Sequence, residues 1–154
     1  MLRVVDLRKT LPATYQADSP QFRLELVASP DEVDELNHVS DLAYLRWVVR
    51  AARAHSDAVG YDYAAFQRLG AVLTVRRHEI DYLQPATAGD RVALTTWVES
   101  WRTTTQVRRT SIVRIDDGRE LARALTQWGL IDAETGKPHK VPDAMRDSFR
   151  KPPR

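Results

Sequence analysis

The segment from Ser40 to Val59 constrains the fold of this chain more than any other. Its pattern predicts a helix about five turns long, with Ser40 before the first turn and Gly60 at the C′ position that closes it. At about 100° per residue, the charged side chains form one narrow stripe, made of Arg46, Arg50, Arg53 and Asp57. One broad apolar face comprises Leu42, Leu45, Val48, Val49, Ala52 and Val59. Most of the remaining surface is also apolar, made of Ala43, Trp47, Ala51, Ala54 and Ala58. A helix with so little polar surface is mostly buried, so we expect a sheet wrapped around it.

The rest of the chain supplies strands for such a sheet. Residues 22–28 begin with apolar side chains that alternate with charged ones, which is typical of a strand. Four later segments are rich in Val, Ile, Thr and Trp, namely 71–83, 91–101, 104–115 and 120–131. The Leu and Ala content of the last segment also suits a helix, but Trp128, Gly129 and the preceding DDG turn favour a strand.

The links between these later strands are short, so neighbouring strands are expected to be antiparallel. The order of one strand, one long helix and four strands predicts an α+β fold, in which a long antiparallel sheet wraps around one central helix. A single sheet of this length needs its edge or its second face covered. We therefore expect a homodimer or a homotetramer.

The composition is that of a soluble globular protein. With 154 residues, 43% of them apolar and 29% charged, we expect a single domain over residues 1–154, with its core at about 20–145 and loosely ordered ends. No apolar run is long enough to cross a membrane, and charged residues interrupt the first twenty positions, so a cytoplasmic location is expected. The chain has no cysteine and no pair of histidines in a metal-binding motif, so we expect neither a metal site nor a cofactor.

The charged residues argue against nucleic-acid binding, because 23 basic and 21 acidic residues are scattered through the chain and leave a net charge of only +2. Arginine greatly outnumbers lysine, and an excess of arginine suits a ligand that carries phosphates. Two arginine pairs, Arg76–Arg77 and Arg108–Arg109, lie within predicted strands, where neighbouring side chains point to opposite faces. We interpret both pairs as solvated strand residues.

Four sequence motifs point to a family. They are DELNHVSDLAYLRW at 34–47, EIDYLQPATAGDRVALTTWV at 79–98, ESWRTTTQVRRTSIV at 99–113 and TGKPHKVPDAM at 135–145. Together they resemble the hotdog-fold acyl-CoA thioesterases of the 4-hydroxybenzoyl-CoA thioesterase-like family, over roughly residues 20 to 145. The first two motifs in combination carry most of the resemblance.

The resemblance implies hydrolysis of a CoA thioester to a free acid and CoA. The family's catalytic carboxylate falls on Asp34, which acts as a general base on water or as a nucleophile. The backbone amide that polarises the thioester carbonyl falls at Asp41 or beside it, where a helix start offers free N–H groups. Two departures stand out. Asn37 replaces a glycine found in many members, and Arg102 is the only basic residue left of a run that follows the strand tryptophan in the aromatic-acyl prototype. Arg102 is therefore our candidate contact for CoA.

Several alternatives stay open. From the residues alone, Asp34 is also explained as a loop acid that caps backbone amides, like Asp31, Glu32 and Glu35 in the same loop. His38 either orients water or the acyl group, or is a structural histidine next to the helix. The alternative function is a non-catalytic acyl-CoA-binding hotdog protein, since a fold does not determine a function. The motifs of hotdog dehydratases are absent, and no GxSxG motif supports a serine hydrolase.

Overall fold

The computed structural model describes residues 20–153, and the N-terminal end that we predicted to be loosely ordered lies outside them. The strands are β1 (Phe22–Val27), β2 (Ala71–Tyr82), β3 (Arg91–Trp101), β4 (Thr105–Arg114) and β5 (Glu120–Asp132). The helices are η1 (Pro30–Glu32), α2 (Asp41–Ala58), α3 (Tyr63–Leu69) and α4 (Asp143–Arg150). The predicted order of one strand, one long helix and four strands is confirmed, and the segment that also suited a helix is strand β5.

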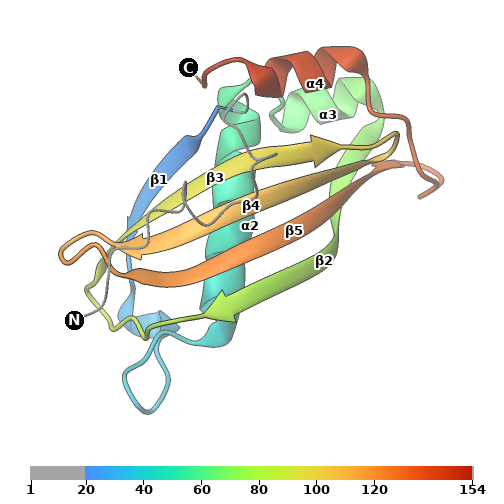
Figure 1. Cartoon of the computed structure of the whole chain (residues 1–154). Helices are drawn as coiled ribbons and strands as arrows, with labels where there is room; N and C mark the ends of the chain where they lie inside the picture. The colour runs from blue at the N-terminus through green and yellow to red at the C-terminus, as the bar shows by residue number, and fades with distance from the viewer. Residues whose placement is uncertain (1–19, 154) are drawn as a thin grey trace.

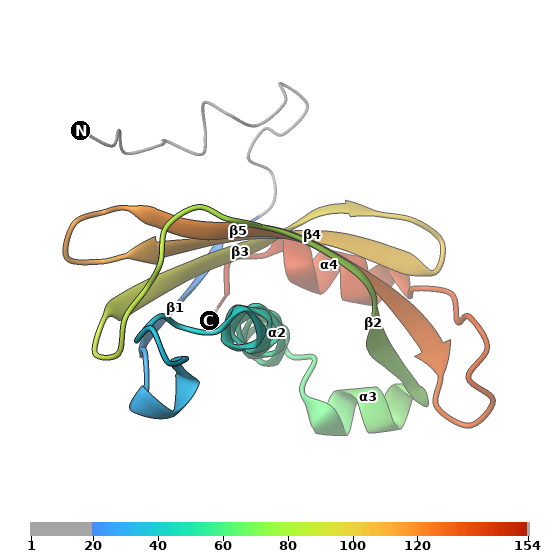
Figure 2. The same ribbon diagram turned by 90° about the horizontal axis from the view of Figure 1, so that it is seen from below.

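The five strands form one sheet in the order β1-β3-β4-β5-β2, and every neighbouring pair is antiparallel. Figure 1 shows α2 crossing behind the sheet, and Figure 2 shows the sheet curving over α2 like a shell. The predicted α+β architecture, a long antiparallel sheet around one central helix, is therefore confirmed. None of the helices within residues 20–153 has the length and apolar content that crossing a membrane requires.

Helix α2 begins and ends where the sequence predicts. The Ser40 side chain accepts a hydrogen bond from the backbone N–H of Ala43, so it caps the first turn. Gly60 follows the C-cap with a φ of 96°, a left-handed conformation that glycine adopts without steric cost.

We predicted that α2 is mostly buried, but the sheet covers only one face of it. Leu42 is 58% exposed, and Leu45 and Val49 are only half-buried. The residues that face the sheet are Ala43, Tyr44, Trp47, Val48, Ala51, Ala52, His55 and Ser56. Small alanines let the helix approach the strands closely, while two aromatic rings fill the space beside them. Within one chain, the helix is therefore less buried than we predicted.

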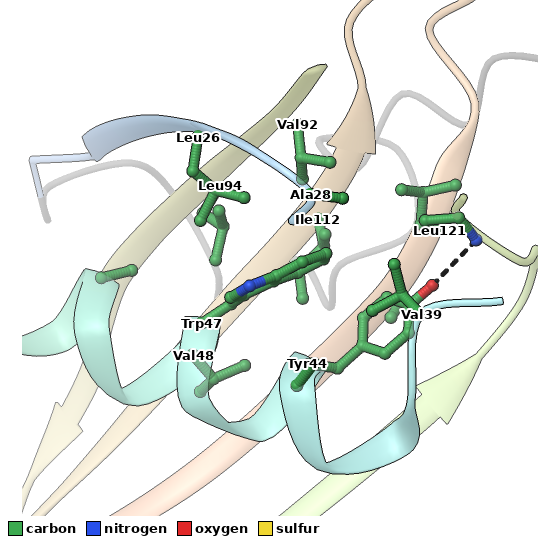
Figure 3. Close-up of a cluster of buried hydrophobic side chains, with 14 of the residues drawn as sticks. Leu26, Ala28, Val39, Tyr44, Trp47, Val48, Val92, Leu94, Ile112 and Leu121 are labelled. Atoms are coloured by element: carbon green, nitrogen blue, oxygen red, sulfur yellow. Dashed lines mark hydrogen bonds between the residues drawn. The ribbon is translucent and has the colours of Figure 1, made fainter. Parts of the chain in front are cut away.

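Two apolar clusters form the core, and the first holds α2 against the sheet. In it, Tyr44, Trp47 and Val48 pack on strand side chains such as Leu94 and Ile112 (Figure 3). The second cluster combines strand residues with one face of α4; it comprises Ala71, Val98, Leu130, Val141, Met145 and Phe149. The two short helices α3 and α4, which the sequence analysis did not predict, therefore close the far end of the molecule.

The two arginine pairs have different outcomes. Arg76 and Arg77 are exposed next to a β-bulge in β2, as expected of solvated residues. Arg109 is partly exposed on the outer face of β4 and pairs with Glu99 at 3.2 Å. Arg108 points to the inner face and is only 2% exposed, so our interpretation of it as a solvated residue was wrong. The cause is the position of β4 in the middle of the sheet, where one of two adjacent side chains must face the helix.

Candidate active site at the start of the central helix

The first two sequence motifs meet in space at the start of α2. The Val39 N–H donates to the carbonyl of Ala86 at 2.8 Å, and the Ala86 N–H donates to the Tyr44 hydroxyl at 3.1 Å, the dashed line in Figure 3. The Tyr82 hydroxyl donates to the carbonyl of Asp41 at 3.1 Å. The loop between β2 and β3 is therefore bonded to the helix start, although the two segments are about forty residues apart.

Glu32 anchors the loop that leads into the helix. Its carboxylate accepts hydrogen bonds from the Trp47 ring N–H at 2.7 Å and from the Ser29 backbone N–H at 3.0 Å. Its carbonyl accepts the N–H of Ser40 at 2.8 Å. Both carboxylate oxygens of Glu32 are thus engaged in holding the loop on α2, which distinguishes this acid from its neighbours.

Asp34 is exposed, and only one of its two carboxylate oxygens has a protein partner. Its Oδ1 accepts from the backbone N–H of Leu36 at 2.9 Å and of His38 at 3.1 Å. Within residues 20–153, no donor contacts Oδ2. The carboxylate therefore caps the loop with one oxygen and presents the other to solvent. Asp34 therefore does cap the loop, as the loop-capping interpretation states, and its second oxygen remains available to react.

Asn37 supplies the backbone conformation that the loop needs in place of glycine. Its φ is 59°, which lies in the left-handed region. Asparagine enters this region more readily than other residues with a Cβ, because its short polar side chain bonds locally. The departure from the family's glycine therefore preserves the left-handed turn between Asp34 and the helix.

One backbone amide at the helix start remains available. The Leu42 N–H is bonded to Asp41 Oδ1 at 3.1 Å, and the Ala43 N–H is bonded to Ser40 Oγ at 3.2 Å. The Asp41 N–H has no acceptor among the residues that the structure describes. It lies at the positive end of the α2 dipole, so it is suited to bind a carbonyl oxygen that becomes negative.

Of the other two predicted site residues, His38 lies on the same loop as Asp34, whereas Arg102 lies elsewhere. His38 is exposed, and within residues 20–153 it makes hydrogen bonds only through its backbone. Arg102 is exposed in the turn between β3 and β4, at the opposite end of β3 from the helix start (Figure 1). A single chain therefore brings together Asp34, His38 and Asp41, but not Arg102. No three His, Asp or Glu side chains in the described part of the chain are placed to hold a metal ion.

A second group of polar residues, which the sequence analysis missed, lies under the C-terminal half of α2. His55 is fully buried, and its Nδ1 accepts a hydrogen bond from Arg108 at 2.9 Å. Burial, together with the charge of Arg108, lowers the pKa of His55 to about 3. Burial lowers the pKa of Arg108 to about 9. The indication in the sequence was the Arg108–Arg109 pair itself, because adjacent strand residues cannot both face solvent when one face packs on a helix.

The chain is similar to known proteins over most of its length. The family model described as the thioesterase-like superfamily matches residues 28–149. No curated protein sequence matches the chain.

Solved structures share the fold at low sequence identity. Slr0204 from Synechocystis, a 1,4-dihydroxy-2-naphthoyl-CoA thioesterase, is 18% identical with a TM-score of 0.77, covering 84% of this chain and 95% of that one. The Staphylococcus aureus protein SAV2348, solved in complex with CoA, is 14% identical with a TM-score of 0.79, covering 88% of each chain. An acyl-ACP thioesterase from Bacteroides thetaiotaomicron is 20% identical with a TM-score of 0.76, covering 86% of this chain and 54% of that one.

Proposed function

Because the chain belongs to the thioesterase-like superfamily, we propose that it hydrolyses an acyl-CoA thioester to a free acid and CoA. In this reaction the water oxygen bonds to the carbonyl carbon, the carbon–sulfur bond breaks, and the leaving thiolate takes up a proton. The observation that carries the proposal is the helix start, where an unpaired amide and a carboxylate with one free oxygen lie on the same short segment. Names of structural neighbours that include CoA thioesterases are consistent with it.

Asp34 is the proposed catalytic carboxylate. Its free Oδ2 acts either as a general base that removes a proton from water or as a nucleophile that forms an anhydride, which water then hydrolyses. The Asp41 N–H is the proposed donor to the oxyanion that develops on the carbonyl oxygen, with the helix dipole adding to its effect. His38 is proposed to orient water or the acyl group, because its exposed side chain lies on the same loop.

We propose that a second copy of the chain completes the site. Strand β2 is twelve residues long and pairs only with β5, so its other edge is unpaired within residues 20–153. Large apolar side chains are exposed around the helix start and the end of β2, namely Leu36, Leu42, Tyr82 and Leu83. A homodimer or homotetramer would cover them. In such an assembly Arg102 would contact the CoA phosphates at a site built with the other chain's loop.

Release of free CoA thiol from a panel of acyl-CoA thioesters tests the proposed function. We expect turnover of at least one member, with saturation at increasing thioester concentration. The alternative function, a non-catalytic acyl-CoA-binding protein, is favoured by one observation, which is that Asp34 Oδ1 already caps the loop. Tight binding of acyl-CoA thioesters with no thiol release from any of them would establish that alternative and refute the hydrolase.

A further inference from the structure

A cavity of about 520 Å³ lies under the C-terminal half of α2, away from the helix start. It is bounded by α2, by α3 and by the inner faces of β4 and β5. Aromatic side chains form much of its wall, among them Tyr61, Phe66 and Trp128. Gln106 and Arg108 also line it, both from β4. A cavity of this volume with a few polar groups is typical of a small-molecule site.

Arg108 brings a positive charge into this cavity without a counter-charge. Its Nη1 donates to His55 Nδ1 at 2.9 Å and to Thr96 Oγ1 at 3.2 Å, while its Nε has no partner. Among residues 20–153, no carboxylate forms an ion pair with Arg108. His55 has no negative charge to offer, and at neutral pH the guanidinium remains protonated because its pKa is about 9. The guanidinium carbon lies 5.6 Å from the centre of the Phe149 ring, so a cation–π contact offsets part of the cost of burial. A buried charge without a counter-charge is still costly, so proteins rarely keep one that serves no purpose.

Two neighbours of Arg108 also have unused hydrogen-bonding groups. Gln106 is 1% exposed, and neither atom of its side-chain amide has a partner in the described part of the chain. The ring N–H of Trp128, which faces Gln106 across the β4–β5 pair, lacks a partner as well. Most buried polar groups in proteins are paired. Three buried donors therefore remain unpaired in residues that line one cavity, and a ligand with oxygen acceptors would reach these atoms if the cavity wall shifts around it.

We propose that this cavity binds the carboxylate of a small organic acid, with Arg108 as its ion-pair partner and Gln106 and Trp128 as further donors. A carboxylate accepts two parallel hydrogen bonds from a guanidinium, and the aromatic wall suits the apolar body of the acid. The same carboxylate can arrive as the far end of the substrate's acyl group or as a free acid. The first source rests on the proposed thioesterase function, and the second does not.

The surroundings of Arg108 favour a polar ligand over a plain alkyl chain. The inner face of the sheet beside it carries three buried threonines, Thr96, Thr110 and Thr126, together with Val98 directly opposite Arg108 on β3. Asp57 and Asp62 line the cavity too, but both are exposed, and Asp62 is engaged in capping α3. Solvent screens these two acids far more than it screens the buried guanidinium, so the net field inside favours an anion.

The first experiment measures binding without turnover, by calorimetry on the full chain. The probes are straight-chain and phenyl-terminated carboxylic acids of four to eight carbons, each paired with its neutral amide. We expect at least one acid to bind at least about tenfold more tightly than its amide. Arg108→Met should abolish that preference. The control variant Arg109→Met, on the outer face of the sheet, should retain it. Equal affinities for acid and amide, no binding of any acid, or unchanged binding by Arg108→Met would each overturn the proposal.

Thermal unfolding separates a binding role from a structural one. If Arg108 serves a ligand, a bound acid should raise the melting temperature of the wild type but not that of Arg108→Met. The variant's own melting temperature combines the loss of a buried charge with the loss of the hydrogen bonds to His55 and Thr96. Gln106→Leu keeps the charge of Arg108, so it should lower the affinity for the acid without abolishing its binding. A large loss of melting temperature in Arg108→Met, with no stabilisation of the wild type by any acid, would assign Arg108 to the fold and refute the site.

Turnover then identifies the source of the carboxylate. If it belongs to the acyl group, Arg108→Met should raise the KM for a carboxyacyl-CoA while leaving that for the matched plain acyl-CoA unchanged. If it belongs to a separate acid, the variant should treat both thioesters alike. If no thioester is hydrolysed, the proposed thioesterase function is refuted. The binding of free acids still tests the proposed carboxylate site independently.

Discussion

At the scale of single residues, the buried contact between His55 and Arg108 makes the stability of the fold depend on pH. Arg108 can only donate, so His55 Nδ1 must be unprotonated to accept its hydrogen bond. Burial and the neighbouring positive charge keep the folded pKa of His55 near 3, well below the ordinary value of 6.5. Between these two values the unfolded chain binds a proton that the folded chain does not, so folding becomes less favourable as the pH falls.

We therefore predict that stability decreases as the pH falls from about 6.5 towards 3, by at most about 1.4 kcal/mol per pH unit from this residue. Between pH 7 and pH 5, the wild type should lose about 2 kcal/mol more than His55→Gln, which keeps an acceptor but does not titrate. Urea unfolding at several pH values measures the difference, with His139→Gln as the control. Parallel pH profiles for the wild type and His55→Gln would contradict the account.

His38 allows a second residue-scale prediction. Its ring has no hydrogen-bond partner within residues 20–153, and the bonds of its backbone to Asp34 do not depend on the side chain. His38→Ala should therefore change the free energy of unfolding by less than about 0.5 kcal/mol while lowering turnover. Paired measurements of thiol release and melting temperature test this. A lower melting temperature with full activity per folded molecule would support the structural role instead.

Single residues also show which features of the site could be predicted from the sequence. The family motif singled out Asp34 among several loop acids. Only the structure shows that the Glu32 carboxylate accepts a hydrogen bond from the Trp47 ring, whereas Asp34 keeps one oxygen free. Arg108 was misjudged, because a strand with polar residues on one face has the same pattern whether that face meets water or lines a cavity. The spacing of residues along a strand specifies which side chains share a face. Whether water, a helix or a cavity lies against that face depends on the tertiary fold.

At the scale of elements, the loop from Val33 to Val39 positions the proposed catalytic carboxylate. A bridge joins its two ends, and Asn37 turns the chain in the left-handed conformation. We predict that Asn37→Gly keeps stability and turnover, whereas Asn37→Ala costs about 1 kcal/mol and lowers turnover, because a Cβ without a bonding side chain is unfavourable at this φ. Urea unfolding and thiol release compare the two, with Glu35→Ala in the same loop as a control. Equal behaviour of the Gly and Ala variants would contradict this role for Asn37.

The regular elements differ in how well the sequence predicts them. Helix α2 and the five strands were predictable, since a serine cap, a closing glycine and long β-branched runs mark their bounds. Helix α4 was not, because its eight residues bury only Met145 and Phe149, too few to show a helical period. The burial of α2 was overestimated, because both of its apolar faces have the same pattern and only the tertiary fold determines which one meets the sheet.

At the scale of the whole molecule, exposed apolar side chains and the unpaired edge of β2 predict self-association. Light scattering at micromolar concentration should give at least twice the mass of one 17.6 kDa chain. Specific activity should fall on dilution as the assembly dissociates, because the proposed site is built from two chains. A mass of one chain together with full activity would contradict the proposed two-chain site.

The distance between Arg102 and Asp34 is a property of the whole molecule that no local pattern contains. The two residues lie at opposite ends of the sheet, since β3 runs from Arg91, beside the end of β1, to Trp101 before the turn. Their cooperation in one site therefore depends on assembly. The sequence motif identifies both candidates, but the fold of one chain separates them.

The central claim is that Asp34 carries out thioester hydrolysis, and the most direct test is the turnover number of Asp34→Asn on the best acyl-CoA of the panel. Asparagine keeps an Oδ1 that can accept from Leu36 and His38, so the loop should hold and stability should change by less than about 1 kcal/mol. We predict that turnover falls by about 10²–10⁴-fold, whereas Asp31→Asn and Glu35→Gln, the matched acids of the same loop, stay near the wild type. Near-wild-type turnover in Asp34→Asn, or an equal fall in all three variants, would contradict the account.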